Sequence, residues 1–281
     1  MERGELVARL REEGTVLASL PGSGWGLFRT PAELVIARNV SEVEPAFRAL
    51  EVWTGRGGYA AGFVSYEAAA AFDPCMETHV PEGFPLLAFA FYESPPEELA
   101  LPDCGDGVFV SALQPEWSEE EYRERIAAVR AELFAGNIYQ ANLTFRCRAP
   151  LTVEPEALFL SLLSHHPVPF AAWVNFCGVK LLSLSPELFL ESDGTRIVSS
   201  PMKGTASRRP IAAEDCAVAA ALAHDPKNRA ENLMIVDMVR NDLGRVCRPG
   251  SVTVDPLFHV DTYATVHQMI STVHGELLPG T

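Results

Sequence analysis

The sequence contains few of the patterns that mark membrane, secreted or metal-binding proteins. Its six cysteines are scattered and include no Cys-x-x-Cys pair, so neither a disulfide framework nor a common type of zinc site is indicated. No apolar run approaches the length of about 18 residues that a membrane span requires. The charged opening Met1–Leu6 also lacks the apolar segment of a signal peptide. We therefore expect a cytoplasmic protein, where scattered thiols stay reduced.

Positive charge is also scarce, with 22 Lys and Arg residues against 37 Asp and Glu residues and a formal net charge of −15. This balance argues against a nucleic-acid-binding protein. The segment 196–250 differs, because nine Lys or Arg residues there outnumber six Asp or Glu residues. A locally basic patch suits a small anionic ligand, although chance clustering explains the count equally well.

The length of 281 residues suits one large domain or two smaller ones. The stretch 93–107 is rich in Pro, Glu, Asp and Gly, which is typical of an exposed connection. We therefore predict an N-terminal portion, residues 1–107, and a second portion, residues 108–281. Helical periodicity predicts helices at 1–14, 118–136, 156–164, 214–223 and 229–242. Runs of β-branched and aromatic residues predict strands at 28–38, 58–66, 85–92, 143–147, 171–176, 179–191 and 195–200.

One lysine lies in a setting that suggests chemistry. The segment Pro201–Arg208 follows the strand predicted at 195–200, and Pro201 should end that strand because proline cannot donate to a central ladder. We expect Lys203 in a loop beside Gly204, a residue that permits close approach of a ligand. A lysine in such a place can act as an amine nucleophile. The alternative, which these residues taken alone favour, is an ordinary solvated lysine in a turn.

Two glutamates occur among apolar residues. Glu187 lies within Ser185–Phe189, with a proline before it and leucines on both sides. A buried carboxylate must be paired, hydrogen-bonded or protonated, and a protonated carboxyl group can serve as a general acid. The alternative is a salt bridge at the end of a strand. Glu231 falls in the apolar stripe of the last predicted helix, where a desolvated carboxylate suits Mg²⁺ held jointly with ligand and water. An ion pair between Asp237 and Arg240 is the structural alternative for the polar end of that helix.

Two further segments are rich in hydrogen-bonding side chains. The turn at 136–146 carries Asn, Tyr and Gln side chains, which either order the loop or line a pocket. In the segment 265–271, His267 and Gln268 place a ring and an amide next to a β run. Successive residues of a strand face opposite sides, so the two cannot both face one site.

Taken together, five segments resemble, in their order, the chorismate-utilising enzymes. The segments are Gly136–Leu143, Ser185–Phe189, Pro201–Thr205, Glu231–Gly244 and Val266–Ser271. The resemblance implies an α+β fold, the four-layer αββα sandwich of two packed, mostly antiparallel β-sheets with outer helices. Family segments that come after the last match have no counterpart before Thr281, so we expect a C-terminally incomplete version of this fold.

The resemblance also implies a reaction. Family members with lysine at the position of Lys203 form the aminodeoxychorismate synthase branch and aminate chorismate at C4, whereas anthranilate and isochorismate synthases usually have alanine there. Lys203 would attack C2 of the ring and form a covalent adduct, and Glu187 would protonate the departing C4 hydroxyl group. The product, 4-amino-4-deoxychorismate, leads to 4-aminobenzoate and folate. Ammonia would come from a glutamine amidotransferase subunit, because nothing in the sequence resembles a glutaminase.

By the same resemblance, Glu231 would be a ligand of the Mg²⁺ that holds the ring carboxylate. Gly204 and Thr205 would line the substrate site. The family histidine of the last segment falls at Gln268, and His267 precedes it by one residue. Which of the two faces the substrate stays open.

Two rival hypotheses remain. One is the large subunit of an anthranilate or 2-amino-2-deoxyisochorismate synthase. The other is a non-catalytic binding or subunit-interaction module, which the missing C-terminal segments favour.

Overall fold

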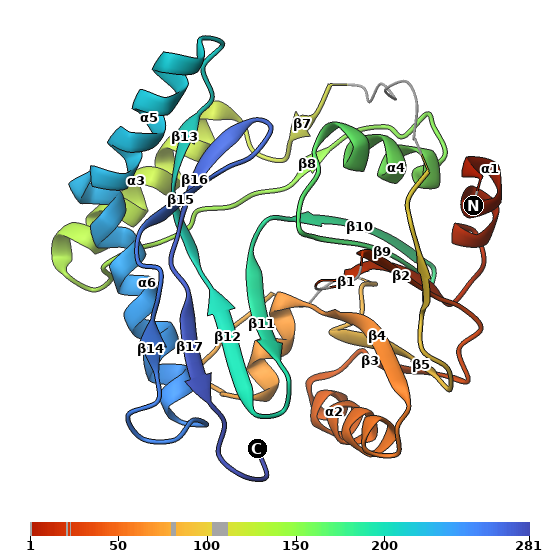
Figure 1. Cartoon of the computed structure of the whole chain (residues 1–281). Helices are drawn as coiled ribbons and strands as arrows, with labels where there is room; N and C mark the ends of the chain where they lie inside the picture. Colours follow the sequence, from red (N-terminus) through yellow and green to blue (C-terminus); the bar gives the residue numbers. More distant parts are fainter. Residues whose placement is uncertain (1, 21, 23, 80–82, 103–111) are drawn as a thin grey trace. The chain divides into compact units, whose positions relative to one another are not determined.

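The structure is a computed structural model that describes residues 2–20, 22, 24–79, 83–102 and 112–281 (Figure 1). The chain divides into two compact units. Unit 1 comprises residues 1–106 and 155–186, and unit 2 comprises residues 107–154 and 187–281. The boundary predicted after residue 107 lies outside the described residues, and the prediction did not include the return of residues 155–186 to unit 1.

Unit 1 contains two antiparallel sheets and helices on their outer faces (Figure 1). Its helices are α1 (Arg3–Leu10), α2 (Val40–Gly55), the 3₁₀ helix η1 (Tyr66–Ala71) and α4 (Pro155–His165). Its strands are β1 (Thr15–Leu20), β2 (Gly24–Phe28), β3 (Glu33–Ala37), β4 (Tyr59–Val64), β5 (Leu87–Tyr92), β6 (Glu97–Leu99), β9 (Phe170–Phe176) and β10 (Val179–Ser185). One sheet has the order β10-β9-β1-β2-β6 and the other β3-β5-β4.

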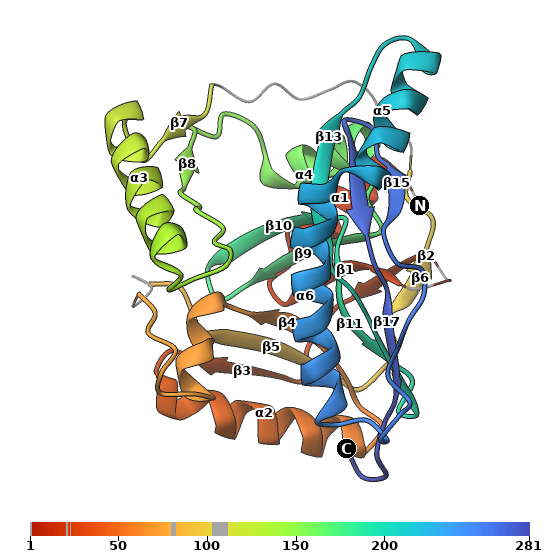
Figure 2. The ribbon, with the colours of Figure 1, turned by 90° about the vertical axis from the view of Figure 1, so that its left-hand side faces the viewer.

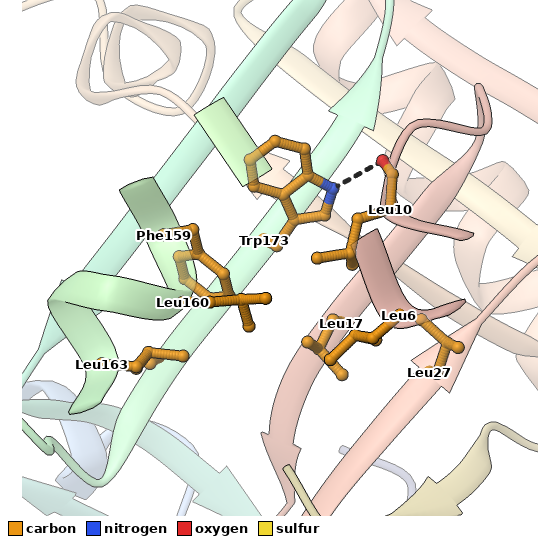
Figure 3. Packing of buried hydrophobic residues seen from close by; sticks show 9 residues of the cluster. Leu6, Leu10, Leu17, Leu27, Phe159, Leu160, Leu163 and Trp173 are labelled. Carbon is orange, nitrogen blue, oxygen red and sulfur yellow. Dashed lines mark hydrogen bonds between the residues drawn. The ribbon is translucent and has the colours of Figure 1, made fainter. Parts of the chain in front are cut away.

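Three apolar clusters hold the layers of unit 1 together. In the first, α1 and α4 cover the outer face of the larger sheet, and the indole N–H of Trp173 donates to the Leu10 carbonyl oxygen at 3.1 Å (Figure 3). A second cluster, with Val174 and Ala90, lies between the two sheets. A third, with Leu87 and Val43, lies between the smaller sheet and α2. Full burial of one such large apolar side chain stabilises the fold by about 1.5–3 kcal/mol. Unit 1 therefore has the predicted layer order helix, sheet, sheet, helix.

Unit 2 combines smaller antiparallel sheets with long helices (Figure 2). Its helices are α3 (Glu119–Ala135), α5 (Ala212–His224) and α6 (Pro226–Gly244). Its strands are β7 (Gln114–Pro115), β8 (Cys147–Arg148), β11 (Leu188–Ser192), β12 (Arg196–Ser200), β13 (Met202–Ser207), β14 (Thr253–Val254), β15 (His259–Thr262), β16 (Val266–Ile270) and β17 (Val273–Glu276). The sheets have the orders β11-β12-β17-β14, β13-β16-β15 and β7-β8. Helices α5 and α6 pack on β13 and its neighbours.

The segment around Lys203 differs from the prediction. Pro201 ends β12 as expected, but the next residue begins β13, so Lys203 lies on a strand and not in a loop. The strand pairs with β16, about sixty residues later in the chain. A ladder with so distant a partner leaves no local pattern in the sequence, which explains why this strand was missed.

Helix α3 lies where a helix was predicted and begins at a capping box. The Ser118 side chain accepts from the N–H of Glu121 at 3.2 Å, and the Glu121 carboxylate accepts from the N–H of Ser118 at 2.8 Å. None of its residues is buried in the part of the chain that the structure describes. Among the described helices, none is both long and apolar enough to cross a membrane.

Candidate functional site

Lys203 lies at a bulge in the ladder between β13 and β16. Met202 pairs with Ile270 and Thr205 with Gln268, so two residues of β13 stand opposite Met269 alone. The second of the two, Gly204, has a φ of +104°. A Cβ atom on Gly204 would lie 3.1 Å from Cβ of Asn228 and 3.2 Å from Cβ of Met269. Both its φ and the lack of space therefore require glycine at this position.

The amine of Lys203 contacts a neutral group. Its Nζ donates to Oδ1 of Asn142 at 3.2 Å, and Asn142 belongs to the polar turn that follows α3. The other two lysines of the sequence each contact a carboxylate, Lys180 that of Glu156 at 2.5 Å and Lys227 that of Glu231 at 3.3 Å. Lys203 is therefore the lysine whose amine contacts a neutral amide in place of a carboxylate.

Thr205 and Gln268 lie together on one face of the sheet. The hydroxyl group of Thr205 donates to Oε1 of Gln268 at 3.0 Å across the ladder. His267, one residue earlier, lies on the opposite face and is only 1% exposed. Its two ring nitrogens lie 2.9 Å from Oγ1 of Thr262 and 2.9 Å from Oδ1 of Asp215. The structure thus brings Gln268, and not His267, beside Thr205.

Asp215 of α5 is the centre of a polar cluster that the sequence analysis missed. Its carboxylate accepts from Nε of Arg208 at 2.8 Å and from the N–H of Arg209 at 2.7 Å, in addition to its contact with His267. The Arg208 hydrogen bond, followed by that of the Arg209 N–H, holds the pKa of Asp215 well below its usual range. The cluster fastens α5 to the end of β13 and to β16. The sequence feature that could have led to this cluster is His267, a histidine one residue before the family position.

Glu187 is exposed, which corrects the expectation of a buried carboxylate. Its neighbours do not cover it, because Phe189 is itself 82% exposed and β11 is the edge strand of its sheet. Oε1 of Glu187 accepts from the backbone N–H of Met202 at 3.0 Å. The carboxylate is thereby tied to the residue that precedes Lys203.

Glu231 lies beside the buried stripe of α6 and not within it. The buried residues of this helix are Asn232, Val236 and Leu243, whereas the Glu231 side chain is 29% exposed. The alternative ion pair at the end of the helix is present, with Nη1 of Arg240 3.1 Å from Oδ1 of Asp237.

Among the described residues, no group of three His, Cys, Asp or Glu side chains is placed to hold a metal ion. Mg²⁺ demands six near-octahedral oxygen ligands, of which protein carboxylates usually supply one or two. Glu231 could supply one such carboxylate.

The comparisons with known proteins agree with one another. Residues 99–281 match the model of a family described as chorismate binding enzymes. An aminodeoxychorismate synthase of Streptomyces pristinaespiralis is 48% identical over 56% of this chain, which spans 22% of that protein. An anthranilate synthase component 1 of Thermus thermophilus is 40% identical over 60% of this chain, which spans 36% of that protein. The chain thus covers well under half the length of these relatives.

The fold also matches solved structures. Anthranilate synthase component I from Streptococcus pneumoniae superposes with a TM-score of 0.69, covering 96% of this chain and 68% of that chain at 20% sequence identity. At this identity the likeness concerns the fold alone. It confirms the predicted fold class, and the position of Lys203 on a strand is a correction of detail within it.

Proposed function

This chain belongs to the family of chorismate binding enzymes, and we propose that it carries the lysine-bearing part of an aminodeoxychorismate synthase site. The reaction would be amination of chorismate at C4 to 4-amino-4-deoxychorismate, a precursor of 4-aminobenzoate and folate. Relatives named aminodeoxychorismate synthase support this assignment. The observation that carries it is the Lys203 amine, which is held at a strand bulge against the Asn142 amide. The residue before Lys203 is hydrogen-bonded to Glu187, and Thr205, two residues after it, is hydrogen-bonded to Gln268.

The proposed chemistry divides one displacement into two. The free amine of Lys203 forms a bond to C2 of chorismate, the ring double bonds shift, and the C4–O bond breaks. Glu187 supplies the proton with which the hydroxyl group leaves as water. Ammonia then forms a bond to C4, the double bonds shift back, and the bond between C2 and the lysine nitrogen breaks. The ammonium product or solvent returns a proton to Glu187, which restores both side chains.

The remaining residues have positioning and binding roles in this proposal. The Thr205 hydroxyl group and the Gln268 amide form one polar edge of the substrate site, and Gly204 permits the backbone bulge that carries Lys203. His267 lies on the opposite face in the Asp215 cluster, so we assign it a structural role. Glu231 is proposed as one ligand of Mg²⁺, which when bound would neutralise the ring carboxylate. The other ligands would have to come from substrate, water or further protein oxygens.

The proposed source of ammonia is a glutamine amidotransferase subunit. The names of the relatives are consistent with such a partner, since anthranilate synthase component 1 is by its name one part of a larger assembly. No residue of this chain is assigned to that contact.

The covalent step has a direct test. The chain is incubated with chorismate and Mg²⁺ without ammonia, and its intact mass is measured. We expect a mass increase of one chorismate less one water, located by peptide mass spectrometry at Lys203. The Lys203→Arg variant should show no increase, and Lys227→Arg, which removes the amine of an 81% exposed lysine, should behave as the unmodified chain does. Failure of the unmodified chain to form the adduct would contradict the proposal.

The second candidate function, amination at C2 as in anthranilate synthase, is favoured by the Thermus thermophilus relative. A product assay with chorismate, Mg²⁺ and ammonium separates the two. The C4 route predicts 4-amino-4-deoxychorismate and its loss in Lys203→Ala. Product aminated at C2 that persists in Lys203→Ala would establish the rival reaction. Calorimetric titration of chorismate into the chain tests the third hypothesis, because absence of binding with Mg²⁺ present would support a non-catalytic module.

A further inference from the structure

A buried amide on α6 contacts the backbone at the bulge. Asn232 is 1% exposed and lies on the apolar face of α6, one turn before Val236. An amide in such a place destabilises the fold unless its polar atoms are hydrogen-bonded, which makes it an unusual choice for a helix face that packs on a sheet. We therefore expect Asn232 to make hydrogen bonds that leucine or valine could not make.

The hydrogen bonds of Asn232 have one consistent direction. The Ser271 hydroxyl oxygen accepts from the N–H of Phe258 at 3.0 Å, so its own hydrogen is free to donate to Oδ1 of Asn232 at 2.6 Å. The Nδ2 group of Asn232 then faces two carbonyl oxygens, that of Lys203 at 3.4 Å and that of Met269 at 3.3 Å. Both distances exceed the usual range of about 2.7–3.2 Å for an N–H···O hydrogen bond, so each contact is a weak one. The Ser271 hydroxyl group therefore fixes which end of the amide is the oxygen, and the Nδ2 group must be the end that faces the two carbonyl groups.

These two carbonyl groups belong to residues that face each other across the bulge. The irregular register leaves Lys203 and Gly204 opposite Met269, so the regular exchange of ladder hydrogen bonds is interrupted there. Asn232 bridges both strands at this point. Asn228, one turn earlier on α6, closes the space over Gly204. The first turns of α6 thus hold the bulge from one side.

From this arrangement we infer that Asn232 is a positioning residue for Lys203, acting through the Lys203 carbonyl group, with Ser271 fixing the orientation of its amide. The inference rests on the proposed function for its catalytic meaning. The backbone of Lys203 is held from α6, and the amine is held by Asn142. A change at Asn232 lets the bulge relax and moves the amine, although Asn232 touches neither the amine nor the substrate. A misplacement of about 1 Å can reduce a rate by on the order of 100-fold.

The first measurement needs no chorismate. The three lysines are acetylated with limiting acetic anhydride over a range of pH, and peptide mass spectrometry gives the reactivity of Lys203 relative to Lys227. The variants are Asn232→Leu, which removes the amide at similar volume, Asn232→Asp, which removes the donor, and Ser271→Ala. Val236→Ala is the matched control, because it weakens the same helix face one turn away without touching the bulge.

The expected result is a changed pH profile of Lys203 acetylation in Asn232→Leu and Asn232→Asp, with the profile of Lys227 unchanged. Ser271→Ala should give a smaller change, and combining it with Asn232→Leu should add little, because both act on one network. Val236→Ala should leave the Lys203 profile intact at a similar loss of stability. An unaltered Lys203 profile in folded Asn232→Leu, or an equal change in Val236→Ala, would overturn the inference.

The second measurement is the rate of adduct formation with chorismate. Asn232→Leu is expected to reduce it on the order of 100-fold, with Val236→Ala near the rate of the unmodified chain. Equal rates in the two variants would count against the positioning role. If the unmodified chain forms no adduct, the proposed function fails, and the acetylation profiles alone decide whether Asn232 positions the amine.

Discussion

The contrast between His267 and Gln268 gives the sharpest prediction about the site. The two residues are adjacent on β16, yet His267 is buried in the Asp215 cluster and Gln268 faces Thr205. His267→Ala should therefore reduce stability, and Gln268→Ala should reduce substrate binding or adduct formation. Loss of stability and loss of substrate binding or adduct formation should therefore occur in different variants, although the two residues are neighbours.

The magnitude for His267→Ala follows from its surroundings. The variant loses two hydrogen bonds of the buried ring, each worth about 1 kcal/mol. The space left by the ring adds about 1–2 kcal/mol, so the free energy of unfolding should fall by roughly 3–4 kcal/mol. Asp215 keeps its contacts with Arg208 and Arg209, so no unpaired charge is left behind. Gln268→Ala loses one exposed hydrogen bond and should change stability by less than about 1 kcal/mol.

Hydrogen exchange read by mass spectrometry is the suitable assay, since it reports β16 and α5 separately from unit 1. Faster exchange in both elements is expected for His267→Ala, with exchange in α1 and α4 unchanged. Urea titration gives the global value alongside. Loss of adduct formation in His267→Ala without faster exchange would refute the assignment, because it would place the ring in the substrate site.

Three further predictions concern the scaffold. Lys180→Met should destabilise unit 1 more than Glu156→Gln does, because Glu156 is fully buried whereas Lys180 can reach water. Burial acts to raise the pKa of Glu156, but the Lys180 hydrogen bond, a backbone hydrogen bond and the charges of Lys180 and Arg11 together lower it. The stabilisation is therefore present above the ordinary carboxyl pKa and is lost as pH falls through the lowered value. Urea titration with tryptophan fluorescence gives the free energy of unfolding at neutral pH and below about pH 4. The difference in this free energy between Lys180→Met and the unmodified chain should shrink in acid. A difference that stays constant with pH contradicts the pairing. Gly204→Ala should lower the melting temperature and slow adduct formation, because its Cβ meets Asn228 and Met269 at a positive φ; unchanged values for both would show that the bulge is not tight. Tyr92→Phe should cost about 1 kcal/mol in urea titration, since its buried hydroxyl group donates to the Gly14 carbonyl oxygen at 2.8 Å, and a neutral result would mean that water replaces this bond.

Features with a local cause were predictable from the sequence. The capping box at Ser118 and Glu121 needs only the two side chains and the turn between them, and it is present. The end of β12 at Ser200 follows from the missing N–H of Pro201. The five family segments and the fold class were also identified, because motif order along a chain is visible without coordinates.

Features that depend on distant partners were not predictable. Glu187 has apolar neighbours in sequence, but burial depends on what covers the strand, and β11 is an edge strand. Asn232 lies within the segment Glu231–Gly244, yet nothing in its helix indicates contacts with two carbonyl groups on strands that come earlier and later in the chain. The choice between His267 and Gln268 likewise required the register with β13, which sets the face to which each residue points.

The extra residue of β13 at the bulge explains why the Lys203 amine is not buried beneath α6. In a regular ladder with Met202 opposite Ile270, Lys203 would stand opposite Met269 and share its face, and Met269 is fully buried. An ammonium group on that face would lose its hydration beneath α6. At the bulge, Gly204 takes the position over Met269, where only a hydrogen atom fits, and the Lys203 amine instead reaches Asn142. The glycine next to the lysine therefore does more than permit a tight backbone path, since it decides which side of the sheet receives the amine.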